Sequence, residues 1–93
     1  MAEFGVHSAC LEDRKLVVEG RCYRGVIFIG QRFTRSHPPE PLAGGETRLH
    51  LIVEAIVIYG RNVDQIEEGL TAEIQFFGDP PNQLAEGWVL STE

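Results

Sequence analysis

Residues 20–33 read GRCYRGVIFIGQRF, and this stretch decides the fold. Its three glycines, Gly20, Gly25 and Gly30, stand five residues apart within a run of β-branched and aromatic side chains. Glycine inside such a run lets a strand bend sharply or lets another backbone approach closely. Small closed β-barrels need corners of this kind. The stretch therefore predicts a small barrel but says little about function, because backbone geometry alone requires these glycines.

The length and composition indicate one globular domain. The 93 residues are enough for one core and too few for two, so we expect a single domain over residues 1–93. Eight basic residues against fourteen acidic residues give a formal charge of -6. This charge repels phosphate backbones and disfavours a general nucleic-acid binder.

The chain contains no apolar window long enough to cross a bilayer, and its first residues lack the basic-then-apolar layout of a signal peptide. We therefore expect a cytoplasmic protein that does not enter a membrane. Cys10 and Cys22 stand twelve positions apart without a CxxC spacing, which is typical of two reduced, partly buried thiols. A disulfide between neighbouring strands stays open as the alternative.

The first half of the chain reads as strands. Residues 15–24 alternate as a long strand with one wet face, and residues 4–9 predict a shorter strand before it. The polar turn at residues 12–14 joins the two into a hairpin. The apolar group at residues 26–29 leads to a turn at Gly30, after which residues 32–35 continue as another strand.

The segment from Ser36 to Glu46 holds three of the five prolines and two adjacent glycines. Such a composition joins neither a sheet nor a helix interior, so we expect a surface loop. The same composition suits a disordered insertion and a recognition element equally.

The second half predicts further strands with short helical turns between them. Strict alternation over residues 47–59 places these side chains on one face, polar at its start and apolar at its end: His50, Ile52, Glu54, Ile56 and Ile58. Residues 62–69 read as a helical turn capped by Asn62 and terminated by Gly69. Residues 72–76 alternate as a half-buried strand, residues 82–86 predict a second helical turn, and residues 88–90 predict the last strand.

These residues resemble the second domain of translational GTPases of the elongation factor Tu type. That family has a long strand reading roughly G-R-x-x-x-G-x-[IV]-x-x-G-[DE]-x-[VF], and the chain is similar to it at Gly20, Arg21, Gly25, Val26, Gly30 and Phe33, with Gln31 in place of the acid. Later family features resemble residues 56–59, Glu67-Glu68-Gly69, residues 72–78 and residues 87–90. The resemblance covers nearly the whole chain. It implies an all-β, roughly six-stranded Greek-key barrel with one or two short helical turns, standing alone.

The GTPase half of that family has no counterpart in these 93 residues, which contain no GxxxxGK[ST] phosphate loop. We therefore expect neither GTP binding nor GTP hydrolysis. The resemblance implies that the barrel of the elongation factor helps to hold the aminoacylated end of tRNA, partly through an acid on the strand that aligns with Ala55 to Tyr59. Here that stretch reads AIVIY and carries no acid.

The arginines are the first candidate binding residues. Five of the eight basic side chains fall in or beside the central strands: Arg21, Arg24, Arg32, Arg35 and Arg61. If Arg21, Arg32 and Arg35 converge, they form a positive patch that could hold a phosphate or an acidic tail. Pairing with Glu19 and other acids is the favoured alternative.

The apolar end of the strand over residues 47–59 is the second candidate. Phe77 points opposite to Phe76, so one of them is exposed unless a loop covers it. We expect Ile56, Ile58 and Phe77 to form a face for a protein partner or a second copy of the chain. The core is the favoured alternative place for these side chains.

No constellation supports catalysis. His7, His37 and His50 have no ligand spacing, and neither cysteine has the flanks of an activated thiol. We therefore expect no enzyme, no metal and no cofactor. The sequence favours a non-enzymatic binding module for protein–protein contact or self-association, with an RNA-binding accessory factor related to translation as the alternative, which would use Arg21, Arg24, Arg32 and Arg35 on phosphates.

Overall fold

The computed structural model describes residues 1–13, 15–38, 47–79 and 84–92. Within this part of the chain every regular element is a β-strand and no helix occurs. The nine strands are β1 (Glu3–Glu12), β2 (Lys15–Arg24), β3 (Val26–Phe28), β4 (Arg32–His37), β5 (Thr47–Ile58), β6 (Arg61–Val63), β7 (Gln65–Glu67), β8 (Thr71–Asp79) and β9 (Val89–Ser91).

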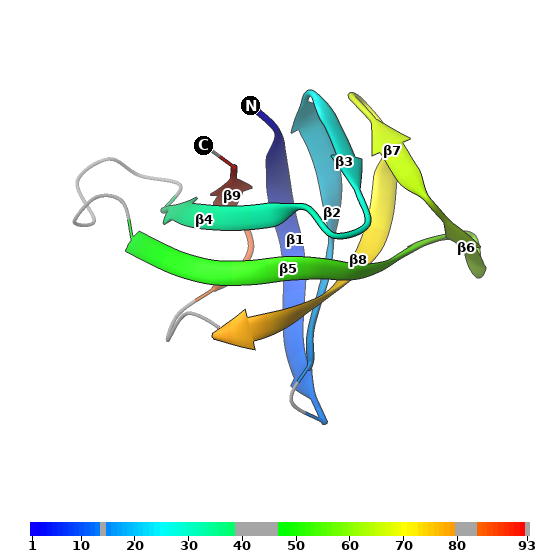
Figure 1. Cartoon of the computed structure of the whole chain (residues 1–93). Coiled ribbons are helices and arrows are strands. Elements are labelled where there is room, and N and C mark those ends of the chain that lie inside the picture. The colour runs from blue at the N-terminus through cyan, green and yellow to red at the C-terminus, as the bar shows by residue number, and fades with distance from the viewer. Residues whose placement is uncertain (14, 39–46, 80–83, 93) are drawn as a thin grey trace.

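Six of these strands form a closed ring. The hydrogen-bonded order is β4-β9-β1-β2-β8-β5, and β5 returns to pair with β4. All the pairings are antiparallel. Strand β6 adds to β5 outside the ring, and β3 and β7 form a separate two-stranded sheet at one end (Figure 1). The predicted all-β, roughly six-stranded barrel is therefore confirmed.

The stretch at residues 20–33 divides into three strands, because the backbone turns at two of its glycines. Gly25 and Gly30 have φ angles of 76° and 88°, in the left-handed region that glycine adopts freely. Gly20 has a different role inside β2. A Cβ at residue 20 would lie 2.0 Å from the backbone oxygen of Gly5 on β1, so the two strands touch there.

A β-bulge in β5 overturns the alternation expected over residues 47–59. The register moves from Val53 opposite Phe76 to Ala55 opposite Gln75, which leaves Glu54 as the extra residue. Side chains at odd positions face the core up to Val53, and side chains at even positions face it from Ile56 onwards. The apolar end of the strand is therefore covered by its own barrel.

The helical turn expected over residues 62–69 is wrong. Residues 61–63 pair with the end of β5, and residues 65–67 pair with β3, where Ile66 lies opposite Ile27. Both of these isoleucines are buried. Pairing with two separate strands satisfies the backbone of this segment, so tertiary contacts override its local capping signals.

The core fills the ring with side chains from all the long strands. Phe33 and Phe76 are fully buried and meet edge to face, with ring centroids 5.5 Å apart and planes at 79°. The other largest buried side chains are Phe4, Ile27, Leu51, Ile56, Ile66, Ile74, Leu90, Val18, Val53 and Cys22.

The structure also bears on the predicted hairpin and on the two segments predicted as a loop and a helical turn. The hairpin of β1 and β2 is confirmed, with its turn at Asp13. Ser36 and His37 of the predicted loop belong to β4 instead, since they pair with β5 and β9. Residues 39–46, and residues 82–83 of the second predicted helical turn, lie outside the described residues.

The two cysteines lie apart as free thiols and do not form the alternative disulfide. Cys10 is exposed near the tip of the hairpin, whereas Cys22 is fully buried. Burial raises the pKa of the Cys22 thiol, and the negative charge of Glu68 acts in the same direction. Only one of the two expected half-buried thiols is therefore accessible.

We expect Gly20→Ala to lower the free energy of unfolding by about 2 kcal/mol or more, because a new methyl group must push the Gly5 backbone away. Gly60→Ala is the control. It has a φ of 76° but no atom within 4 Å of the new Cβ, so only backbone strain of about 1 kcal/mol applies. Urea denaturation followed by circular dichroism measures both. Equal losses would contradict the close approach of β1 and β2.

We expect a thiol reagent at mildly alkaline pH to label Cys10 quickly and Cys22 only after unfolding. Rapid labelling of both thiols in the native protein would be inconsistent with this core.

The same burial predicts how the stability depends on pH. Since the folded pKa of Cys22 is raised, its neutral thiol favours the folded state below the ordinary thiol pKa. This contribution to the free energy of unfolding falls as the pH rises above that value, and a Cys22→Ala variant should lack the decline.

Candidate functional site

Three adjacent strands, β4, β5 and β8, place an aromatic, an aliphatic and a cationic side chain in one row. Ile52 on β5 pairs with Phe77 on β8 at one side and with Arg32 on β4 at the other. Phe77 remains 44% exposed, Ile52 is half-buried, and Arg32 is exposed. The row therefore faces outward, while Phe76 beside it faces the core.

The neighbouring positions along the same strands carry ionisable side chains. His50 lies opposite Asp79, and Arg48 lies opposite Arg35. Together with the first row these residues form what we call the basic–apolar face. It consists of Arg32, Arg35, Arg48, His50, Ile52, Phe77 and Asp79.

A hollow of about 220 Å³ opens on this face. Its walls are Arg32, His50, Leu51, Ile52, Gly78 and Asp79. Gly78 has a φ of 128°, and a Cβ there would lie 2.2 Å from the backbone oxygen of His50. A side chain cannot be added at this position without moving β5, so part of the wall is bare backbone.

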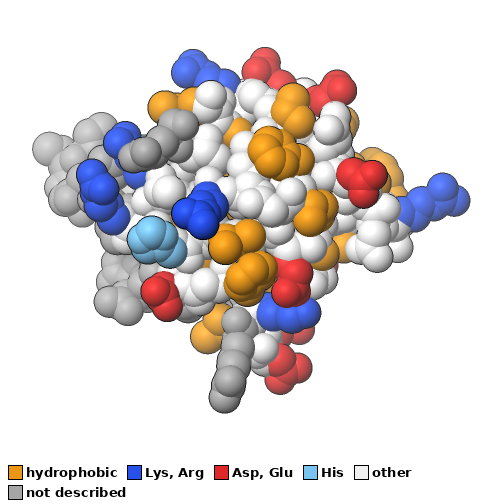
Figure 2. Space-filling model, in the orientation of Figure 1, with side chains coloured by type: hydrophobic (Ala, Val, Ile, Leu, Met, Phe, Trp, Pro, Cys, Tyr) orange, Lys and Arg blue, Asp and Glu red, His pale blue; other side chains and the backbone are white. Residues whose placement is uncertain are grey.

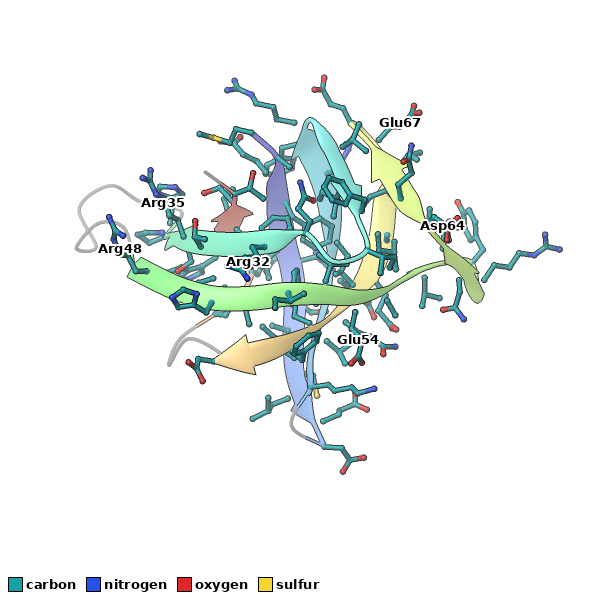
Figure 3. All side chains as sticks on the ribbon, in the orientation of Figure 1. Arg32, Arg35, Arg48, Glu54, Asp64 and Glu67 are labelled. Atoms are coloured by element: carbon teal, nitrogen blue, oxygen red, sulfur yellow. The ribbon has the colours of Figure 1, made fainter. Side chains whose placement is uncertain are left out.

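Charge is distributed unevenly over the molecule. Figure 3 places Arg32, Arg35 and Arg48 on β4 and the start of β5, whereas Glu54, Asp64 and Glu67 lie toward the other side. In Figure 2, Lys and Arg atoms gather over β4 and the start of β5, beside hydrophobic atoms over the middle of the view. A positive patch therefore exists locally in a chain whose formal charge is -6.

The structure separates the four arginines named from the sequence. Arg32 and Arg35 share β4, but Arg21 and Arg24 lie on β2, and two strands separate β2 from β4 in either direction around the ring. The Arg21 Nε donates a hydrogen bond to the backbone oxygen of Gly69, at 3.1 Å. Arg24 pairs in register with Glu3. Arg21 therefore does not converge with Arg32 and Arg35, which was the condition for a positive patch made of all three.

The three apolar residues named from the sequence, Ile56, Ile58 and Phe77, do not share one surface either. Ile56 is completely buried, and Ile58 is half-buried against the core, so neither forms a patch with Phe77. The bulge at Glu54 is the cause, because it turns the end of β5 over. Phe77 instead meets Ile52. Simple alternation does place Ile52 and His50 on one face, but it offers no signal that β8 and β4 lie beside them.

A second surface hollow lies over β1 and β2, with a volume of about 560 Å³ and walls that include Gly5, Gly20 and Tyr23. Its ionisable side chains are of both signs, and three of them have partners. Arg21 binds the Gly69 carbonyl, while His7 Nδ1 lies 3.7 Å from Glu86 Oε2. The arginine of this hollow is therefore already bound, whereas Arg32 of the basic–apolar face has neither an ion pair nor a hydrogen-bond partner among the described residues.

The described ranges contain neither a candidate metal site nor a candidate membrane-spanning helix. There, no group of three or more His, Cys, Asp or Glu side chains has the arrangement of a metal site. The same part of the chain contains no helix with the length and apolar character needed to cross a membrane.

Comparison with known proteins shows a likeness of fold alone. No protein-family model matches the sequence, and no curated protein matches it. Among solved structures, translation elongation factor SelB from Methanococcus maripaludis in its apo form matches with a TM-score of 0.78 and 16% identity. The same factor in complex with the GTP analogue GppNHp matches with a TM-score of 0.77 and 16% identity.

Each match covers 99% of this chain but only 19% of SelB. The chain thus corresponds in size to one domain of that factor, and the likeness extends over all of it. The resemblance to a β-barrel domain of the elongation factor Tu type, expected from the glycine spacing, is confirmed as a likeness of fold to a β-barrel domain of a translational GTPase.

Proposed function

We propose that the chain is a non-enzymatic binding module that holds a protein partner on the basic–apolar face. The observation that carries this proposal is the outward row of Phe77, Ile52 and Arg32 across three strands. An aromatic side chain beside arginine is the composition that protein interfaces favour at their centres.

The energetics of the row suit such a role. Covering the exposed part of Phe77 and the rim of Ile52 would contribute on the order of 1 kcal/mol for each side chain. The strands hold both residues in place before any partner arrives, so little conformational entropy is lost on binding. A site on paired strands is also more rigid than one on a loop.

The charges indicate the character of the partner. Arg32, Arg35 and Arg48 gather in a protein that is otherwise acidic, so an acidic segment is attracted to this face and repelled elsewhere. The centre of the face is apolar. The partner therefore combines acidic side chains with at least one large apolar side chain.

A second candidate is an RNA-binding accessory factor. Three arginines beside an exposed phenylalanine favour it, since single-stranded RNA is held by cations and by bases stacked on aromatic rings. SelB is by its description a translation elongation factor. The formal charge of -6 and the presence of Asp79 in the hollow favour the protein partner instead.

We expect Phe77→Thr to weaken capture of the native partner about tenfold, because it removes the apolar anchor of the face. Leu11→Thr is the matched control, since Leu11 is 61% exposed on β1 away from this face. Wild type and both variants serve as bait in nuclease-treated lysate, with circular dichroism to verify folding. Sedimentation measures whether the partner is a second copy.

A protein lost only from the Phe77→Thr bait, or a dimer that this change alone dissociates, supports the proposal. A catch that nuclease removes favours the RNA candidate and contradicts the proposal. Equal capture by all three baits would show that the partner binds elsewhere.

A further inference from the structure

We propose that the basic–apolar face recognises an extended peptide segment that carries one large apolar residue and acidic residues at alternate positions from it. The inference rests on the proposed function and adds the chemistry of the partner. One carboxylate enters the hollow beside Gly78, and the apolar side chain covers Phe77 and Ile52.

The hollow has the donors that a carboxylate needs. The Arg32 guanidinium lines it, and within the described residues this group has neither an ion pair nor a hydrogen-bond partner. A guanidinium presents two parallel N–H groups that match the two oxygens of a carboxylate. The imidazole of His50 lines the same hollow and adds a third possible donor.

Asp79 determines how much negative charge the hollow accepts. Among the described residues that line this hollow it is the one acid, and it lies opposite His50 in the strand register. Arg32 and Asp79 largely offset one another's charge in this wall. The second charge of a phosphate therefore gains little attraction there, but it raises the cost of removing water from the anion. The wall therefore favours a carboxylate over a phosphate.

The spacing along β5 sets the pattern of the peptide. Arg48, His50 and Ile52 are alternate residues on one strand, so consecutive members lie about 7 Å apart on the same face. An extended peptide lying along β5 repeats its side chains at the same interval. Its apolar residue at Ile52 therefore places carboxylates near His50 and Arg48, in the pattern apolar-x-acid-x-acid or its reverse.

The apolar anchor and the first carboxylate are tied together by Ile52. This side chain pairs with Phe77 and with Arg32, and it also lines the hollow. A ligand that covers Phe77 thus reaches the Arg32 guanidinium by way of Ile52. Neither an acidic segment without the apolar residue nor an apolar segment without acid would use both parts of the site.

The test uses the whole chain labelled with ¹⁵N and the peptide acetyl-Ser-Trp-Ser-Glu-Ser-Glu-Ser-amide, whose blocked ends leave the glutamates as the only carboxylates. We expect the amide resonances of Ile52, Gly78 and Arg32 to move in a saturable way below about 1 mM peptide. Replacing both glutamates by glutamine, or the tryptophan by serine, should weaken binding about fivefold or more.

Two protein variants separate this inference from the proposed function. Arg32→Gln should weaken binding of the peptide about fivefold, while Arg24→Gln, the same change on the exposed end of β2, should leave it unchanged. If Phe77→Thr abolishes capture of the native partner but Arg32→Gln and the glutamine peptide change nothing, the carboxylate site is overturned and the binding module stands.

Further probes identify the source of the anion. A phosphoserine peptide that binds more tightly than the glutamate peptide would overturn the preference for carboxylate. A short oligouridine that moves the same resonances when the peptide does not would assign the face to RNA. Absence of any shift at these three amides with the glutamate peptide would overturn the inference, whatever the capture experiment finds.

Discussion

The pairing of β4 with β5 closes the ring of six strands, and the rest of the structure depends on this closure. A closed ring gives each of its strands a partner on both sides, but it forces the sheet to curve sharply. The curvature is accommodated where β1 and β2 touch at Gly5 and Gly20, and where β5 bulges at Glu54. With these corners in place, the two buried rings of Phe33 and Phe76 meet at the centre of the core.

The bulge that helps to curve β5 also determines which surface is available for binding. Before the bulge, His50 and Ile52 face outward beside β4 and β8. After it, Ile56 turns into the core, so the apolar end of the strand is used for stability. One extra residue thus separates a stretch of β5 whose even-numbered side chains face outward from a stretch whose even-numbered side chains pack on the core. The ion pair between Lys15 and Glu54, at 2.7 Å, marks this position on the outside, where exposure keeps its contribution below about 1 kcal/mol.

The likeness to a domain of SelB concerns the backbone of the barrel, since only 16% of the aligned residues are identical. Glycine corners and buried apolar side chains are what such a backbone requires, and these features carried the resemblance in the sequence. The basic–apolar face, in contrast, does not follow from the barrel backbone. It consists of outward side chains that the barrel tolerates without needing them, so its chemistry is a property of this chain.

The sequence by itself determined the strand character of most segments, the β1–β2 hairpin and the places where the chain turns, because alternation and glycine spacing are local signals. It also identified Arg32, Arg35 and Phe77 as surface candidates. Contacts between distant segments were needed to show that residues 61–63 and 65–67 form strands, that Ile56 is buried, and that Arg21 lies apart from Arg32. Each of these outcomes depends on pairing between segments far apart in the chain or on a one-residue bulge, and a bulge reverses the facing of every later residue in its strand without changing the local pattern.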